Sequence, residues 1–372
     1  MVNRYKSITL LAIFCTSSLF ADTLKPNGCK GPNLCSSYPL TDGCNWQFDV
    51  GLIYQQMRIS GAEVATAVIL RDNGHIPSDA QDFVNITNSN VRFKFDVDAG
   101  LKLGVGYYFE NNSWLFLANF EWLRSQANFS TVSQPPIYYL PSEFQTVWAE
   151  NGSSSLINFQ KVDASLAVDY FLLDVVLAKG SYFADPFSFE PFGGIQSTWL
   201  SYNTEKLFSD DAKSHLPANS AFSFITNVNF WGVGPEIGLN SAYYMMGGWS
   251  IYSTMNLAVL FGQTTLFNMN GIVTTLVDPT FNNTSDQNNV LCPTARTILG
   301  LQYERDIYCD KQHIRTRLGF DARYIFNQFP VVNYLAQYTY NHSYQPVFTA
   351  PSFEENNAFG MVGLILDIAY DF

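Results

Sequence analysis

A strict two-residue alternation of apolar and polar side chains limits what this chain can fold into. The clearest case runs from Val91 to Phe109, where every second residue is apolar and most residues between them are charged or glycine. An α-helix would scatter those charges around its whole circumference, whereas a β-strand places them all on one face. The stretch therefore predicts a strand.

The same alternation returns at 313–326 and at 360–372, where the chain ends on Phe372. Other segments rich in aromatic and β-branched residues are bounded by turn residues. They predict strands at 46–59, 114–124, 158–177, 188–202, 222–242, 249–262 and 294–306. Apolar alternation also occurs at 264–277 and 331–349, where further hairpins could lie. We therefore expect ten to sixteen strands.

The connections between these strands alternate in length. Long connections are expected at 60–90, 125–157, 203–221, 263–293 and 327–359, and short ones at 110–113, 185–187, 243–248 and 307–312. This alternation is typical of an antiparallel up-and-down β-barrel in a bacterial outer membrane, with short periplasmic turns and long extracellular loops. Both termini of the chain are then expected in the periplasm.

The composition separates a membrane barrel from a soluble β-sandwich. Charged residues make up only 14% of the chain, against roughly 25% in soluble domains. Sandwich strands usually have ~5 to 6 residues, and most strands predicted here are longer. Their polar face is rich in glycine, aspartate and arginine, as in a wetted lumen, and tryptophan and tyrosine lie near strand ends. The fold class is therefore all-β, a transmembrane barrel in contact with outer-membrane lipid.

The first residues have the pattern of a cleavable secretory signal peptide. Arg4 and Lys6 precede an apolar run from Ile8 to Phe20, and the small residue Ala21 follows. We divide the chain into a signal peptide at 1–21, a cysteine-containing periplasmic segment at 22–45 and the barrel at 46–372. The whole chain has a net charge of −12, which argues against nucleic acid as a partner.

No motif predicts an enzyme. The four histidines are not spaced with Cys, Asp or Glu as metal ligands, and neither a catalytic triad nor a pair of catalytic carboxylates has a local signature. The glycines at 232, 234 and 238 have the wrong spacing for a nucleotide loop, and Pro235 lies between them. We expect no metal, no cofactor and no catalytic residues.

Charged residues on the polar strand faces are the candidate pore lining. They are Arg92, Lys94, Asp96, Asp98, Lys102, Arg315, Arg317, Asp321 and Arg323. They could set the electrostatic field that a permeating solute crosses. They could instead pair across the interior and fill it, which a barrel of only ten strands would favour because small barrels are occupied by their own side chains. The number of strands decides between the two interpretations.

Five cysteines remain after removal of the signal peptide, so complete pairing within the chain is impossible. The predicted topology puts Cys29, Cys35, Cys44 and Cys309 on the periplasmic side and Cys292 in an outer loop. Because the periplasm is oxidising, we expect the periplasmic four to form disulfides, within the chain or with envelope neighbours. The alternative is that these thiols have no structural role.

The sequence resembles the Legionella-type major outer membrane protein family, which has cysteine-bearing relatives in Chlamydia-related bacteria. The resemblance rests on 93–107 with Trp114, Trp122 and 123–125, on 190–199, on 229–241 and on 319–328. It implies a pore-forming barrel and an abundant surface protein, and it supplies no catalytic residues. The loops depart from the family pattern.

These observations predict a porin-like channel in the bacterial outer membrane for diffusion of small hydrophilic solutes. The alternative is a surface adhesin or structural envelope barrel whose long loops bind a host partner. Homo-oligomers or disulfide-linked envelope neighbours are possible partners in either case. We expect the terminal aromatic Phe372 to serve as an assembly signal.

Overall fold

The structure is a computed structural model, and it describes the strands of the chain with some of their turns. The described residues are 46–59, 63–70, 86–109, 114–132, 137–139, 147–150, 153–156, 158–159, 161–179, 181–184, 186–209, 221–273, 280–307, 312–334, 337–340, 346–349 and 352–372. The predicted signal peptide and the segment 22–45 lie outside them.

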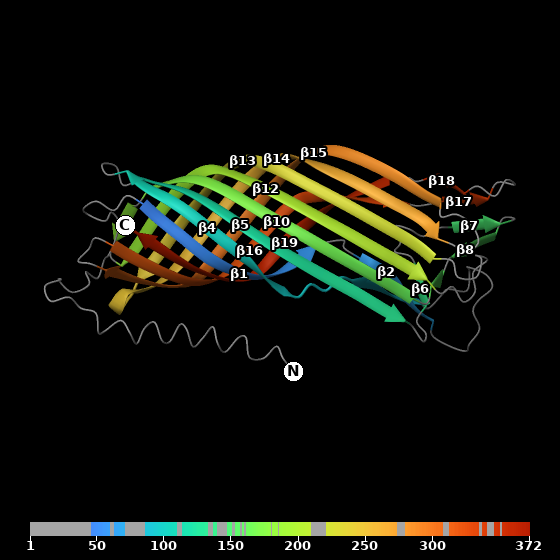
Figure 1. The fold of residues 1–372 in the computed structure, drawn as a ribbon, viewed down its shortest axis with the longest axis horizontal. Helices are drawn as coiled ribbons and strands as arrows, with labels where there is room; N and C mark the ends of the chain where they lie inside the picture. Colours follow the sequence, from blue (N-terminus) through green and yellow to red (C-terminus); the bar gives the residue numbers. More distant parts are fainter. Residues whose placement is uncertain are drawn as a thin grey trace.

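Ten long antiparallel strands form a closed barrel (Figure 1). They are β1 (Trp46–Ile59), β4 (Val97–Phe109), β5 (Trp114–Val132), β10 (Lys161–Lys179), β12 (Phe187–Ser209), β13 (Ala221–Tyr244), β14 (Trp249–Val273), β15 (Thr280–Ile307), β16 (Gln312–Tyr334) and β19 (Ser352–Asp371). Their order is β10-β5-β4-β1-β19-β16-β15-β14-β13-β12, and β12 pairs back onto β10. The predicted barrel is confirmed, at the lower limit of the expected strand number.

The two ends of the barrel differ in their connections. At one end the turns are short, as between β13 and β14, where Gly247 and Gly248 have φ angles of 79° and 82° that favour glycine. Trp46 and Phe372 meet at this end through two backbone hydrogen bonds of 3.2 and 3.0 Å. Outer-membrane barrels turn their short connections to the periplasm, which places both residues there.

Short strands lie beyond the other end of the barrel (Figure 1). One four-stranded sheet contains β2 (Glu63–Leu70), β3 (Ile86–Arg92), β6 (Ile137–Tyr139) and β9 (Asn158–Phe159). The other contains β7 (Val147–Glu150), β8 (Ser153–Leu156), β17 (Gln337–Tyr340) and β18 (Pro346–Thr349). A short strand, β11 (Ser181–Ala184), pairs with β12 next to the end of β10.

The predicted single strand at 91–109 is wrong. β3 ends at Arg92, residues 93–96 belong to no strand, and β4 begins at Val97. Phe95 is 3% exposed inside the barrel, whereas Val97 is 41% exposed on the outside. These two residues would share a face in a continuous strand, so the regular alternation of the sequence concealed a break.

The predicted long connection at 263–293 is also wrong, because most of it is strand. β14 continues to Val273 and β15 begins at Thr280, and the two pair along this length. Most of the alternating segment at 264–277 is therefore a continuation of β14 and not a separate hairpin. Cys292 consequently lies in β15, where it is fully buried in the barrel interior, and not in an outer loop.

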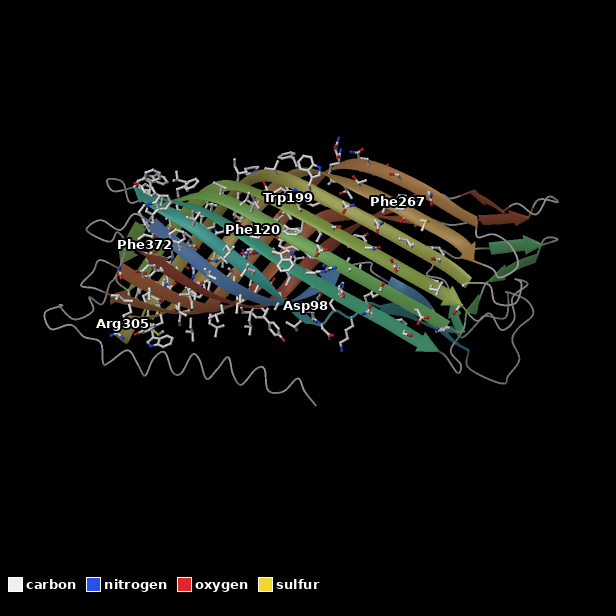
Figure 2. The ribbon with its side chains drawn as sticks, viewed as in Figure 1. Asp98, Phe120, Trp199, Phe267, Arg305 and Phe372 are labelled. Atoms are coloured by element: carbon white, nitrogen blue, oxygen red, sulfur yellow. The ribbon has the colours of Figure 1, made fainter. Side chains whose placement is uncertain are left out.

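The outer surface of the barrel has two levels of aromatic residues, partly visible in Figure 2. The lower girdle, near the short turns, contains Trp46, Tyr107, Phe109, Trp114, Phe187, Tyr243, Trp249, Tyr303 and Phe372. The upper girdle is a cross-strand row in which Trp122, Phe171, Trp199 and Trp231 are successive partners. Such girdles mark the two membrane interfaces.

The spacing of the girdles fits a bilayer. Trp114 and Trp122 on β5 are eight residues apart, which is ~27 Å along a strand and ~20 Å along the membrane normal at the usual tilt. The apolar band of an outer-membrane barrel is about 25 Å tall. We call the barrel between the girdles the membrane band and its continuation beyond the upper girdle the projecting part. Among the described residues, no helix is long and apolar enough to cross a membrane.

Candidate functional site: the charged layer inside the barrel

Each of the ten barrel strands sends at least one polar side chain inward within the membrane band. We call the following set the charged layer: Asp49, Lys102, Glu121, Asp174, Gln196, Glu236, Asn256, Arg296, Arg317, Asp321, Arg323 and Asp367. Alternation along each strand produces the layer, since the residues on either side of each member face lipid. Apart from Arg317, every member is at most 8% exposed.

One cluster of the charged layer crosses the lumen. Arg296 on β15 donates to Glu121 on β5 at 2.8 Å, and these strands are five places apart in a barrel of ten, on opposite walls. The same guanidinium holds Asp321 through two hydrogen bonds of 3.1 and 2.7 Å. Arg323 on β16 also bonds Glu121, at 2.5 Å, and donates to Tyr170 on the opposite strand β10. These side chains bridge the interior.

A second cluster lies along β1, β4, β16 and β19. Lys102 is 3.3 Å from Asp49 and 3.0 Å from Asp367, and Arg317 contacts the same two carboxylates at 3.1 and 2.7 Å. The Arg317 guanidinium lies 5.7 Å from the ring centre of Tyr252. That ring lies so close to β15 and β16 that a Cβ atom at residue 319 would be 2.4 Å from its hydroxyl, which explains the glycine there.

Two buried carboxylates of the layer lack a described basic partner. Asp174 on β10 and Glu236 on β13 are 5% and 2% exposed, and neither forms an ion pair with a described lysine or arginine. Asn256 donates to one oxygen of Glu236 at 2.5 Å, and its other oxygen has no hydrogen-bond partner among the described atoms. This side of the layer is the acidic side.

Apolar side chains fill the interior next to the charged layer, toward the long loops. The cluster contains Met57, Phe95, Leu123, Ala127, Leu166, Val168, Tyr170, Leu172, Leu200, Val228, Phe230, Ala258, Leu260, Leu266, Cys292, Ile325, Phe359 and Met361. We call it the apolar core. Several members, such as Leu200 and Phe230, are only 1% and 2% exposed. A wide aqueous channel would leave its lining wet, so the described interior is closed at two successive levels.

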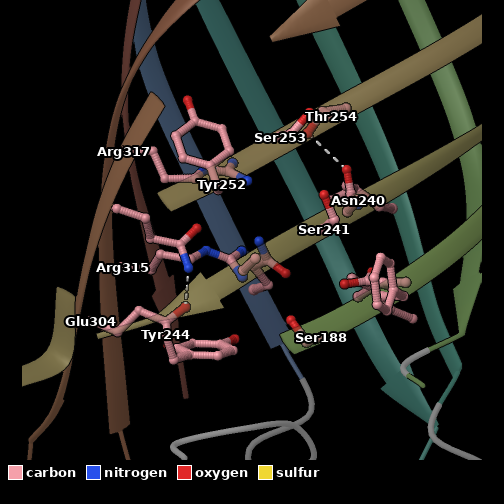
Figure 3. Close-up of a pocket in the computed structure, with 17 residues that line it drawn as sticks. Ser188, Asn240, Ser241, Tyr244, Tyr252, Ser253, Thr254, Glu304, Arg315 and Arg317 are labelled. Carbon is pink, nitrogen blue, oxygen red and sulfur yellow. Dashed lines mark hydrogen bonds between the residues drawn. The ribbon is translucent and has the colours of Figure 1, made fainter. Parts of the chain in front are cut away.

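A small polar cavity of about 80 Å³ lies between the charged layer and the short-turn end (Figure 3). Arg315, Arg317 and Glu304 line one side, and Ser188 and Asn240 come from other strands. Nearby, the ring of His313 is hydrogen-bonded to Asp371 at 3.0 Å. No group of three or more His, Cys, Asp or Glu side chains in the described part of the chain has a metal-binding arrangement.

The structure brings together only part of the predicted pore lining. Lys102, Arg317, Asp321 and Arg323 belong to the charged layer, and Arg315 lines the small cavity.

The other predicted residues lie elsewhere. Asp98 accepts a hydrogen bond from Ser125 at 2.5 Å outside the layer. Lys94 and Asp96 are exposed in the segment between β3 and β4. The side chain of Arg92 and all of Cys29, Cys35, Cys44 and Cys309 lie outside the described residues. Phe372 stacks on Phe48 with ring centres 5.6 Å apart.

Sequence reasoning missed the two residues that bridge the lumen, Arg296 and Glu121. Both lie inside strands that were predicted from the sequence, and each is a single charge between uncharged neighbours. Such a charge could have been predicted to face the lumen, because a charged side chain in a membrane strand avoids the lipid-facing side. The predicted pore lining came only from 91–109 and 313–326, where several charges alternate with apolar residues.

Comparison with known proteins gives a family and distant structural likenesses. A family model described as the Legionella pneumophila major outer membrane protein precursor matches residues 41–372. No curated protein matches the chain. The outer membrane protease OmpT from Escherichia coli has 11% identity and a TM-score of 0.43, over 88% of this chain and 97% of that chain. A TodX deltaS2S3 mutant, a monoaromatic hydrocarbon channel, has 12% identity and a TM-score of 0.32, over 89% and 91%.

Proposed function

Because the chain belongs to the Legionella pneumophila major outer membrane protein family, and is therefore a bacterial outer-membrane protein, we propose that it is a closed barrel that presents its long loops at the cell surface. Its role is then structural or adhesive, with a host or envelope partner bound by the loops. It has no catalytic role in this proposal.

The observation that carries this proposal is the hydrogen bond between Arg296 and Glu121. It joins opposite walls of the lumen at 2.8 Å. With ten strands the barrel is small enough for side chains to fill it, which favours the second of the two sequence-based interpretations. The apolar core closes the interior again beyond this level.

Reconstitution in planar bilayers tests the proposal. We expect no steady conductance from the folded protein and no swelling of liposomes in sugars or amino acids. Heat-modifiable migration on a denaturing gel verifies that the reconstituted protein is folded. Rapid entry of sugars through the folded protein would contradict a closed barrel.

A second candidate is a narrow channel for small hydrophilic solutes. It is favoured by the charged layer, in which all ten strands contribute a polar side chain although burying charge is costly. Conduction would need both the ion pairs and the apolar core to open. Hydrophobic constrictions gate by excluding water, so this candidate predicts that Phe230→Ser raises conductance many-fold. A closed structural barrel predicts lower stability from the same change, with no conductance.

The cysteines remain part of the proposal. We propose that Cys29, Cys35, Cys44 and Cys309 form disulfides within the chain or with envelope neighbours. Non-reducing gels test this, since only free thiols and monomer would contradict it. Phe372 as an assembly signal is a further proposal, supported by its position at the closing contact with Trp46.

A further inference from the structure

The outward-facing residues just beyond the upper interface on four adjacent strands share one chemistry. They are Ser201 and Asn203 on β12, Asn227 and Asn229 on β13, Gln263 and Thr265 on β14, and Gln287 and Asn289 on β15. We call this set the amide face. All eight are uncharged amides or hydroxyls, and none is apolar. Most are exposed, and the rest are half-buried.

The amide face is continuous across its strands. Ser201 pairs with Asn229, which pairs with Thr265, which pairs with Gln287. The hydroxyl of Ser201 donates to the side-chain oxygen of Asn229 at 2.7 Å, so neighbouring side chains lie within hydrogen-bonding reach. The face begins directly after lipid-facing residues, as on β15, where Leu291 is 47% exposed and Asn289 follows two positions on.

The height of the amide face matches the headgroup region of the outer leaflet. Its residues lie two and four positions beyond the last lipid-facing apolar residue of the membrane band on each strand, which is ~5 and ~10 Å along the membrane normal for a tilted strand. The headgroup region of a bilayer is ~5 to 8 Å thick on each side. Whatever headgroups surround the barrel must therefore lie against this face.

The chemistry of the face selects among headgroups. Phosphate headgroups are bound by clusters of lysine and arginine, and this face has no charge. Asn, Gln, Ser and Thr offer both hydrogen-bond donors and acceptors, as sugar hydroxyls do. On the neighbouring strand β10 and on β5 next to it, the residues two positions beyond the upper girdle, Asp169 and Arg124, are charged and lie 3.6 Å apart. At that height the uncharged surface therefore does not continue from β12 onto β10.

We propose that the amide face binds the sugar headgroups of the glycolipid in which the barrel is embedded. The barrel is then held in its leaflet on one side by hydrogen bonds to saccharide as well as by its apolar band. The occupant is the lipid-anchored sugar, which the membrane keeps at high local concentration beside the face.

Thermal unfolding of the full-length protein in vesicles tests this proposal. Vesicles of phosphatidylcholine with one-third lipopolysaccharide are compared with phosphatidylcholine alone and with phosphatidylcholine containing one-third phosphatidylglycerol. A ligand that binds only the folded state raises the unfolding midpoint. We expect a rise of several degrees with lipopolysaccharide alone. An equal midpoint in all three membranes, or an equal rise with phosphatidylglycerol, overturns the proposal.

A matched pair of variants locates the effect. Asn203→Ala, Asn227→Ala and Asn289→Ala together remove amides of the face and should abolish most of the rise. The control changes Ser209, Ser223 and Asn283 to Ala, which lie four to six positions farther out on the same strands and faces, and should keep it. If both triple variants retain the rise, or both lose it, the face is not the binding surface.

Free oligosaccharide released from the same lipopolysaccharide tests whether the sugar must be anchored to the lipid. Added at the same total concentration to phosphatidylcholine vesicles, it should leave the midpoint unchanged, because it is not concentrated at the membrane. A rise equal to that with the intact glycolipid would show that a soluble glycan is the occupant and would overturn the assignment to the lipid.

Discussion

The membrane band and the projecting part are built from the same strands with opposite polarity. On β12, within the band, Ile195 is 57% exposed on the outside and Gln196 is 4% exposed inside. Farther along the same strand Leu200 is 1% exposed inside, and Asn203 is exposed on the outside. The lining changes from polar to apolar as the outer surface changes from apolar to polar.

This change in polarity follows the medium around the strands, which is lipid at the membrane band and water at the projecting part. In the band, lipid accepts apolar side chains on the outside, so hydrophobic burial gives little reason to place them inside. Ion pairs and hydrogen bonds hold much of the interior there, beside a small apolar cluster of Ile53, Tyr252, Ile298 and Ile365. In the projecting part water surrounds the strands, so the hydrophobic effect drives apolar side chains inward, as in a soluble barrel. The lumen is consequently closed by two different kinds of interaction in series.

Removing one charge of the bridging cluster should give the largest loss of stability. In Arg296→Met, Asp321 loses both of its bonds from the guanidinium and, among the described residues, keeps the 2.8 Å bond from Gln55, while being 0% exposed. Removing one partner of a buried ion pair costs about 3–5 kcal/mol. Urea unfolding of the reconstituted barrel should show a loss in the free energy of unfolding of that size.

The double variant Arg296→Met with Asp321→Asn is the control for this change. It removes the stranded carboxylate and should recover a large part of the loss, because the cost comes from the uncompensated charge. A single-variant loss below about 1 kcal/mol, as for an exposed pair, would show that the interior is wet and would break the distinction between the two parts.

An inward truncation in the projecting part should have the next largest effect. Leu200→Ala removes a side chain from the apolar core and should cost about 2–5 kcal/mol. Leu207→Ala, on the outer face of the same strand, where this side chain is 39% exposed, should stay within about 0.5 kcal/mol. Similar losses from the two changes, measured by the same unfolding assay, would show that the projecting part has no packed core.

The sequence predicts the strands well because alternation is a local signal. This signal does not show which of the two alternating sets of residues faces lipid and which faces the interior. On β10 the apolar residues Leu173, Val175 and Leu177 occupy odd positions and face lipid, whereas Leu166 and Val168 occupy even positions and face inward. Between these two sets, most residues of β10 are apolar, on both faces, so the sequence shows one uninterrupted strand. The sequence therefore predicted the strand, but not that its apolar face changes from the outside to the inside of the barrel.

The site was harder to predict than the fold for a related reason. The contact between Arg296 and Glu121 joins residues 175 positions apart on opposite strands, and local alternation shows only that each faces inward. Which walls meet depends on the number of strands, which the sequence left between ten and sixteen. Once ten strands are known, the filled lumen follows from barrel size.

A single arginine introduced on the outer surface should lower the free energy of unfolding in the membrane band but not in the projecting part, and this is the smallest of the expected effects. Leu257 on β14 is 58% exposed, between Trp249 of the lower girdle and Gln263 of the amide face, so Leu257→Arg puts a charge in lipid near the middle of the bilayer. This costs about 2–4 kcal/mol at the midplane and falls to about 0–1 kcal/mol near the interfaces. Ser285→Arg, on the outer face of β15 in the projecting part, should cost little because water surrounds it. Equal losses in urea unfolding from vesicles would mean that lipid reaches the projecting part, and the upper girdle would not mark the membrane boundary.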